Sequence, residues 1–175
     1  MFVKTKIQLL LVGIVAISLY SCIKTQSVPN TPSIAFKDFV KYGKDSADMI
    51  ITFKDGDGDI GLVPGDTAPP HNVNGKYYYD MVMEYNYKGA DGKFHRFKSA
   101  TATDSMIIGY HIPYITPVGQ NKVLDGEIRA HILAPYYVVD PLVIPAHKVI
   151  RFDIYIYDRA LNKSNVITTP EISVP

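Results

Sequence analysis

The sequence predicts an all-β fold: an antiparallel β-sandwich of about eight strands, with an up-and-down β-barrel as the alternative. Apolar residues recur with a period of two, which is the pattern of strands with one buried and one wet face. The segments between these runs are rich in Pro, Gly and Asp, which end strands and turn the chain. No stretch of ten or more residues carries a helical apolar stripe. We therefore expect a single β-sandwich domain over residues 34–175.

The expected strands follow this alternation. In the clearest run, from Tyr77 to Lys88, Tyr and Met side chains fall on one face, while Asp80, Glu84 and Asn86 fall on the other. The short Gly-Ala-Asp-Gly connection that follows is typical of a hairpin. The predicted strands cover residues 34–41, 48–54, 77–88, 93–98, 106–115, 127–137, 149–157 and 165–174.

The closing segment, Phe152 to Asn165, resembles the last hairpin of many bacterial immunoglobulin-like domains. In those domains an alternating strand is followed by Asp-x-Ala-Gly-Asn-x-Ser and a final strand. This chain has Asp158, Ala160 and Asn162 at the matching positions, with Leu161 in place of the usual Gly. The resemblance implies an immunoglobulin-like arrangement of the sandwich.

The first 21 residues have the order of a secretory signal. Lys4 and Lys6 precede an apolar stretch, and a small Ser21 comes before Cys22, the only cysteine of the chain. The apolar stretch has about a dozen residues, whereas a membrane span needs about 20. We expect a cleaved signal peptide over residues 1–21 and a flexible tether over residues 22–33. With one cysteine, no internal disulfide can form.

The segment Leu19-Tyr20-Ser21-Cys22 resembles the lipobox of bacterial lipoproteins, which has an apolar residue, two small residues and Cys; Tyr20 departs from that pattern. The resemblance implies cleavage before Cys22 and transfer of a diacylglyceryl group to its thiol. Each buried methylene contributes about 0.8 kcal/mol, so two or more acyl chains anchor a protein durably. The expected location is the cell envelope, with the membrane as a partner through the lipid on Cys22.

The mature chain as a whole resembles small Bacteroidota lipoproteins with an immunoglobulin-like domain, a resemblance that implies no particular activity. No acidic run of the kind that can direct such lipoproteins to the cell surface follows Cys22. We therefore favour the periplasm-facing side of the outer membrane, with the cell surface as the alternative.

Charge excludes one class of partner. The formal net charge of the chain is +1, and removal of Lys4 and Lys6 with the signal leaves −1. A nearly neutral domain lacks the basic patch that nucleic-acid binding requires. We expect no nucleic-acid partner.

The most specific internal motif is Asp55-Gly56-Asp57-Gly58-Asp59. Three carboxylates at alternate positions suit Ca²⁺, which takes six to eight oxygen ligands at about 2.3–2.6 Å. With Asp66 at the twelfth position, the spacing resembles the calcium loops of EF-hands and dockerins. The resemblance stops there, because Ile60 stands where those loops have Gly and a strand, not a helix, precedes the motif.

The motif therefore predicts a calcium loop at the end of a strand, with Asp55, Asp57 and Asp59 as ligands. Further candidate ligands are Asp66, Asp158 and Asn162. The alternative is a solvated turn without metal, because Asp and Gly are common in turns for conformational reasons alone.

Catalytic motifs are missing from the sequence. The five histidines are scattered, and there is no Gly-x-Ser-x-Gly elbow. We expect a non-catalytic binding or structural module, not an enzyme, whose partner is an envelope protein or a glycan. The alternative function is a calcium-dependent carbohydrate-handling enzyme or its accessory domain.

Overall fold

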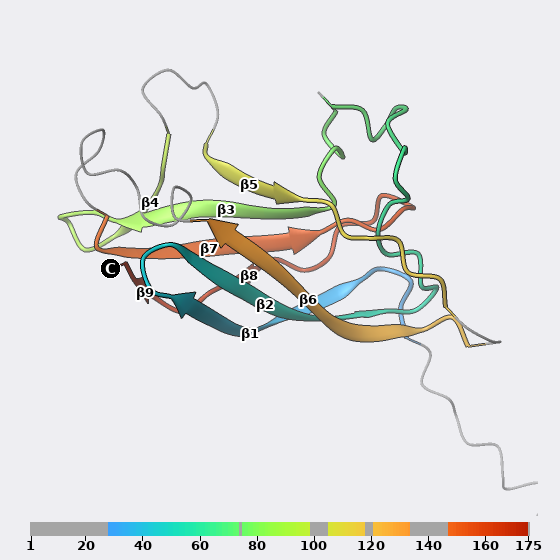
Figure 1. Cartoon of the computed structure of the whole chain (residues 1–175), viewed down its shortest axis with the longest axis horizontal. Helices are drawn as coiled ribbons and strands as arrows, with labels where there is room; N and C mark the ends of the chain where they lie inside the picture. Colours follow the sequence, from blue (N-terminus) through green and yellow to red (C-terminus); the bar gives the residue numbers. More distant parts are fainter. Residues whose placement is uncertain (1–27, 74, 99–104, 118–120, 134–146, 175) are drawn as a thin grey trace, which may run out of the picture.

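The computed structural model describes residues 28–73, 75–98, 105–117, 121–133 and 147–174 (Figure 1). The predicted signal peptide and Cys22 lie outside these residues. No helix in the described part of the chain has the length and apolar character that a membrane span requires.

The strands form two antiparallel sheets. The first contains three strands in the order β1-β2-β6, and the second contains six, with β4-β3-β7-β8 as its main path and with β5 paired to β3 and β9 to β7. The first sheet consists of β1 (Ser33–Tyr42), β2 (Ser46–Asp55) and β6 (Leu124–Leu133). The second consists of β3 (Met81–Lys88), β4 (Phe94–Arg96), β5 (Ile107–Tyr110), β7 (Val149–Ile156), β8 (Ile167–Thr168) and β9 (Ile172–Ser173).

This arrangement confirms the predicted all-β sandwich. The two sheets stay separate and do not close into one ring of strands, which selects the sandwich over the up-and-down alternative. Two early strands pair with a later one in the first sheet, while the middle hairpin pairs with the closing strands in the second.

Period-two patterning places the core between the sheets. Along β7 the side chains of Phe152 and Ile154 are fully buried, whereas their neighbours are partly exposed. Met49 and Ile51 of β2 and Tyr85 of β3 complete the centre, and the Tyr85 ring meets the Phe152 ring edge-on at 5.8 Å. Each such buried side chain contributes about 1.5–3 kcal/mol to folding.

Several of the predicted strands differ in extent from those in the structure. Of the predicted strand over residues 106–115, β5 covers only Ile107–Tyr110. Residues 77–80 form a turn and are not part of β3. The Tyr79 ring packs against Gly109 of β5, where a Cβ atom would lie 2.1 Å from it. The predicted last strand divides into β8 and β9, with Pro170 between them. Pro lacks the N–H that would continue the ladder. In β6 the described residues end at Leu133, so the predicted part beyond it is outside the description.

Asp80 is a further correction. The alternation placed its side chain on the wet face of a strand, but it is only 3% exposed. Its Oδ1 accepts a hydrogen bond from the Ile112 backbone N–H at 2.7 Å, and its carbonyl oxygen accepts one from the Tyr157 N–H at 2.8 Å. Asp80 therefore joins three segments at one end of the sandwich.

Candidate metal site

The aspartate loop begins where β2 ends, at Asp55. Its glycines are needed for close backbone approach. A Cβ atom at Gly56 would lie 2.2 Å from the carbonyl oxygen of Val28, and one at Gly58 would lie 2.1 Å from that of Lys122. Gly58 also has a φ of +69°, a conformation that side chains disfavour. The loop therefore lies tightly against two other segments of the chain.

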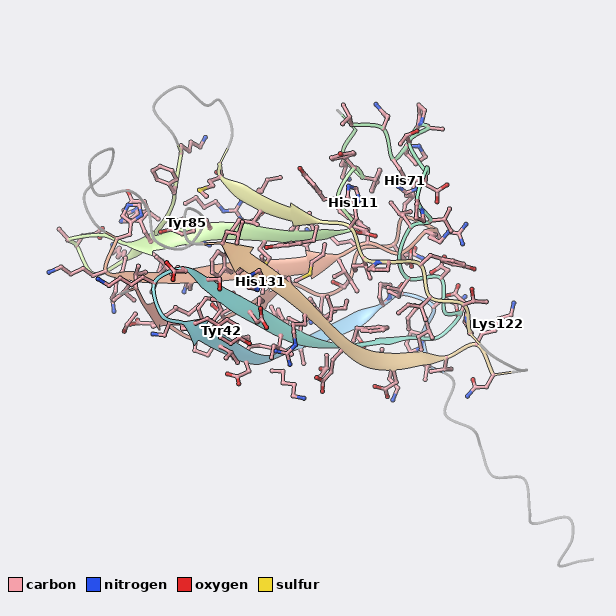
Figure 2. All side chains as sticks on the ribbon, in the orientation of Figure 1. Tyr42, His71, Tyr85, His111, Lys122 and His131 are labelled. Carbon is pink, nitrogen blue, oxygen red and sulfur yellow. The ribbon has the colours of Figure 1, made fainter. Side chains whose placement is uncertain are left out.

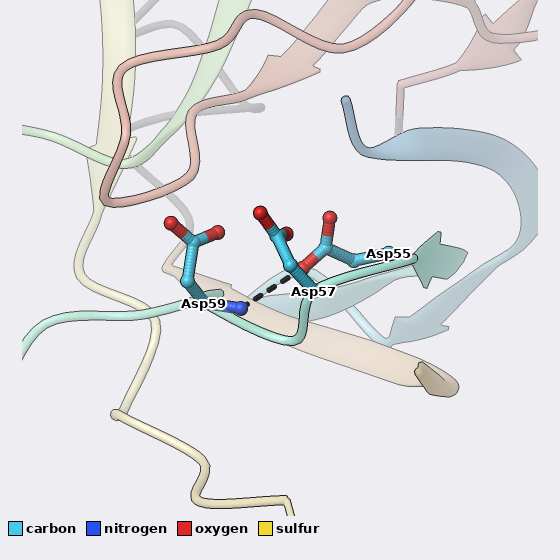
Figure 3. A group of neighbouring side chains, drawn as sticks. All are labelled: Asp55, Asp57 and Asp59. Carbon is cyan, nitrogen blue, oxygen red and sulfur yellow. Dashed lines mark hydrogen bonds between the residues drawn. The ribbon is translucent and has the colours of Figure 1, made fainter. Parts of the chain in front are cut away.

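The three carboxylates of the loop converge (Figure 3). One oxygen from each of Asp55, Asp57 and Asp59 lies within 4.8 Å of the others. The loop is closed by the Asp59 N–H, which donates to Asp55 Oδ2 at 3.0 Å. The Oδ1 atoms of all three are buried and have no hydrogen-bond partner among the described residues. Because buried polar atoms are normally paired, these three oxygens are the candidate ligand atoms of the loop.

The electrostatics of the loop are unfavourable for the protein alone. Asp55 is fully buried, and this burial, together with the charges of Asp57, Asp59 and Asp158, raises its pKa from 3.8 to about 6. Burial and the charges of Asp158 and Asp57 also raise the pKa of Asp59. Carboxylates repel one another at such separations, and a bound cation removes that repulsion.

The turn between β7 and β8 covers the loop. The Arg159 and Ala160 N–H groups donate to Asp59, to its carbonyl oxygen at 3.1 Å and its Oδ2 at 3.0 Å respectively. Asp158, 2% exposed, forms a single β-bridge with Ile60. The metal-ligand candidates of the loop are thus held in place by a segment about a hundred residues away in the sequence.

The remaining predicted ligands lie in two places. Asp158 faces the loop closely enough for its charge to act on Asp55 and Asp59, but its two oxygens accept hydrogen bonds from the backbone N–H and side-chain amide of Asn162, at 2.7 and 2.8 Å. Asn162 therefore orients Asp158. Asp66 lies in the turn that follows the loop, where its Oδ2 accepts the Val63 N–H at 3.3 Å.

Sequence reasoning missed Asp80 as a functional candidate. Its Oδ2 is buried without a hydrogen-bond partner in the described part of the chain, and burial raises its pKa to about 6. A signal was present: the three residues that follow, Met-Val-Met, are apolar on both faces of the strand, which indicates burial on both sides.

The histidines do not gather into a metal site within the described residues. His131 Nδ1 lies 2.7 Å from Asp48 on the outer face of the first sheet, and the His111 ring packs against that of Tyr78 at 4.8 Å. His147 stacks on Tyr87 with 4.0 Å between ring centroids. Each of these three histidines has a structural partner of its own.

An apolar cavity of about 530 Å³ adjoins the aspartate loop. Its walls come from residues 62–67 and 111–114, with Tyr78 at one side. Asp66 is the one carboxylate among its lining residues. Hydrolysis of a glycoside ordinarily needs two facing carboxylates, which the described lining of this cavity does not supply.

Comparisons of the chain with protein-family models, with curated proteins and with solved structures gave no match. The functional argument therefore depends on the residues of the site.

Proposed function

We propose that the protein is a membrane-anchored envelope lipoprotein that acts as a non-catalytic binding or structural module, and that Ca²⁺ bound by Asp55, Asp57 and Asp59 stabilises its sandwich. The observation that carries the metal assignment is the convergence of three buried carboxylate oxygens that lack partners among the described residues.

The ligand chemistry favours calcium. The cluster offers oxygen atoms alone, with neither imidazole nor thiolate, and carboxylate oxygens suit hard cations. Ca²⁺ accepts irregular coordination and additional water ligands, whereas Mg²⁺ demands nearly ideal octahedral geometry. A Ca²⁺ ion here would join the end of β2 to the β7–β8 turn through Asp59, which both segments already contact.

The lipid anchor is supported by the signal-like order of the first 21 residues and by the position of Cys22. Acylation is measured directly by mass spectrometry of the Cys22 peptide from protein purified from cell membranes. A diacylglyceryl adduct on Cys22 is the expected result. An unmodified Cys22, or a chain that still carries the signal, would contradict the lipoprotein assignment.

Calcium binding is tested by thermal unfolding in millimolar Ca²⁺ and in EDTA. At about 100-fold saturation a bound ligand adds about 2.7 kcal/mol to the free energy of unfolding. For a domain of this size that corresponds to a rise of roughly 5–11 °C in the midpoint. Mg²⁺ at the same concentration should produce a smaller shift.

The matched variants for this test are Asp57→Asn and Asp45→Asn. Asp57→Asn removes one charge of the cluster and should abolish most of the calcium-dependent shift. Asp45 lies exposed between β1 and β2, so its change to Asn should leave the shift intact. Equal melting midpoints in Ca²⁺ and EDTA for the unaltered protein would refute the calcium site and leave the motif as a turn.

A further inference from the structure

The chain enters the sandwich at the same end as the aspartate loop. The carbonyl oxygen of Pro29 accepts a hydrogen bond from the Gly56 N–H at 2.9 Å, and Val28 lies against the same glycine. The ten-residue β1 then runs to Tyr42, about 30 Å away at the usual rise per residue. The point of entry and the β1–β2 turn therefore lie at opposite ends of the molecule (Figure 1).

The length of chain before Val28 limits the distance from the anchor. Val28 follows Cys22 by six residues, which span at most about 20 Å when fully extended. If Cys22 carries a lipid, as proposed above, the loop end of the sandwich stays within about 20 Å of the bilayer surface. The inference that follows rests on that part of the proposed function.

The same end exposes apolar side chains. Val63, Tyr114 and Ile115 are 38%, 36% and 39% exposed. They lie on two segments joined by hydrogen bonds, from the Leu62 N–H to the Ile112 carbonyl at 3.0 Å and from the Tyr114 N–H to the Leu62 carbonyl at 3.2 Å. Val63 and Tyr114 also line the apolar cavity. We call the side chains of Val63, Tyr114 and Ile115 the apolar rim.

The apolar rim is attached to the aspartate loop. A Cβ atom at Gly61 would lie 2.3 Å from the Pro113 carbonyl oxygen, and one at Gly58 would lie 2.6 Å from the Pro117 side chain. The segment from Pro113 to Pro117 thus follows the loop toward the point where the chain enters. His111 and Lys122 mark the two sides of this end in Figure 2.

Cations accompany the apolar rim. The Arg159 guanidinium lies over the Tyr114 ring, 4.7 Å from its centroid, and Lys122 is exposed on the neighbouring loop. Tyrosine rings favour the headgroup region of a bilayer, where basic side chains lie close to the lipid phosphates. The acids at this end include Asp57 and Asp59, whose charge the proposed Ca²⁺ would compensate, and Asp66, which accepts the Val63 N–H.

We propose that the apolar rim contacts the phospholipid surface, with Arg159 and Lys122 facing the phosphates, so that the sandwich has a fixed orientation on the membrane. A phospholipid surface fits this end better than a protein partner does, because the short connection to Cys22 brings the bilayer there in every anchored molecule.

The absence of tryptophan and the single cysteine make this proposal testable. Residues 22–175 retain every buried core residue of the described structure, from Ile34 to Ile172. This chain is coupled through Cys22 to a maleimide-bearing lipid in phosphatidylcholine vesicles that contain lipids brominated near the top of the acyl chain. A Tyr114→Trp variant supplies one fluorophore in the apolar rim. A Tyr42→Trp variant, at a side chain 47% exposed near the opposite end, is the matched control.

The proposal predicts that tryptophan emission from the Tyr114→Trp variant shifts to shorter wavelength and is quenched by the brominated lipid, while emission from the Tyr42→Trp variant is unchanged. Adding Val63→Asp and Ile115→Asp to the Tyr114→Trp chain should restore its emission. Unquenched emission from vesicle-bound Tyr114→Trp protein, or equal quenching of both variants, would overturn the orientation. Because the lipid is coupled chemically, these results do not depend on acylation of Cys22 in cells. A lack of acylation in cells would refute the lipoprotein assignment but would leave the fluorescence results unchanged.

Discussion

Replacement of Asp80 by Asn should remove a defined part of the pH dependence of stability. Asp80 is buried, and burial raises its pKa from 3.8 to about 6. Its Oδ1 accepts the Ile112 N–H, an interaction that the amide oxygen of Asn can retain. The substitution therefore changes the charge while it preserves the backbone contact.

The sign follows from proton linkage. As pH rises from about 4 to about 6, the unfolded chain has already released the Asp80 proton while the folded chain still holds it. Stability must then fall with rising pH, by about 1.4 kcal/mol per unit, or about 3 kcal/mol over the window. Asp80→Asn should lose this decline. Its free energy of unfolding relative to the unaltered protein should rise by about 3 kcal/mol between about pH 4 and about pH 6.

The assay is urea unfolding in EDTA at pH values from about 3.5 to about 7.5, which bracket the titration of the group in both states. EDTA keeps metal from the aspartate loop, and Asp55, whose pKa is also about 6, is present in both chains and cancels in the difference. The amide group that replaces Oδ2 adds a cost in free energy that does not vary with pH. The test is therefore how the free energy of unfolding changes with pH, not its value at any one pH. Parallel pH profiles for the two chains would refute the assignment of a buried, proton-holding Asp80. Asp45→Asn, on the exposed turn, should show the unaltered profile.

Three further predictions concern the loops of the molecule. Leu161 has a φ of +67°, a backbone conformation that costs a side-chain-bearing residue about 1–2 kcal/mol. Leu161→Gly should therefore raise the free energy of unfolding by that amount, as measured by thermal or urea unfolding. A loss of stability would show that the contacts of the Leu161 side chain contribute more than its backbone conformation costs. Gly58→Ala should destabilise the fold and remove the calcium-dependent stabilisation, because its Cβ atom would lie 2.1 Å from a carbonyl oxygen. Gly43 has a similar φ of +65° but open space where its Cβ atom would lie, so Gly43→Ala should cost only about 1 kcal/mol and keep the calcium effect. Equal effects of the two substitutions would contradict the close approach at Gly58. Calcium affinity, measured by titration calorimetry, should fall as pH drops below about 6. The reason is that Ca²⁺ must displace the proton that the folded apo-protein holds on Asp55. An affinity independent of pH would exclude Asp55 as a ligand.

The strands were predictable because their physical cause is local. Alternation of apolar and polar residues requires a half-buried strand wherever it occurs, and β7 follows that pattern residue by residue. The convergence of Asp55, Asp57 and Asp59 was predictable for the same reason, since two-residue spacing and glycines confine them to one short loop. The two-sheet sandwich was expected from the many short strands and the lack of a helical pattern, and the resemblance of the last hairpin supported it.

The features that the sequence did not predict depend on contacts between distant segments. Asp80 alternates correctly as a wet-face residue, yet it is buried because Ile112 and Tyr157 approach it from other parts of the chain. Likewise, the packing of the loop against Val28 and Lys122 is visible in the sequence only as two glycines whose purpose is unspecified. Local pattern cannot assign such glycines to a contact, because a free turn would favour the same residues.

The loop allows the turn and the metal hypotheses to be separated residue by residue. Close backbone contacts account for Gly56 and Gly58, because a side chain at either position would collide with a carbonyl oxygen. Hydrogen bonds account for one oxygen each of Asp55 and Asp59. Neither explanation reaches the three buried Oδ1 atoms, and a turn alone would be more stable with Asn or Ser in place of at least one of these mutually repelling acids. A bound cation would turn their proximity from a cost into a contribution to stability, and that is the reasoning behind the proposed calcium site.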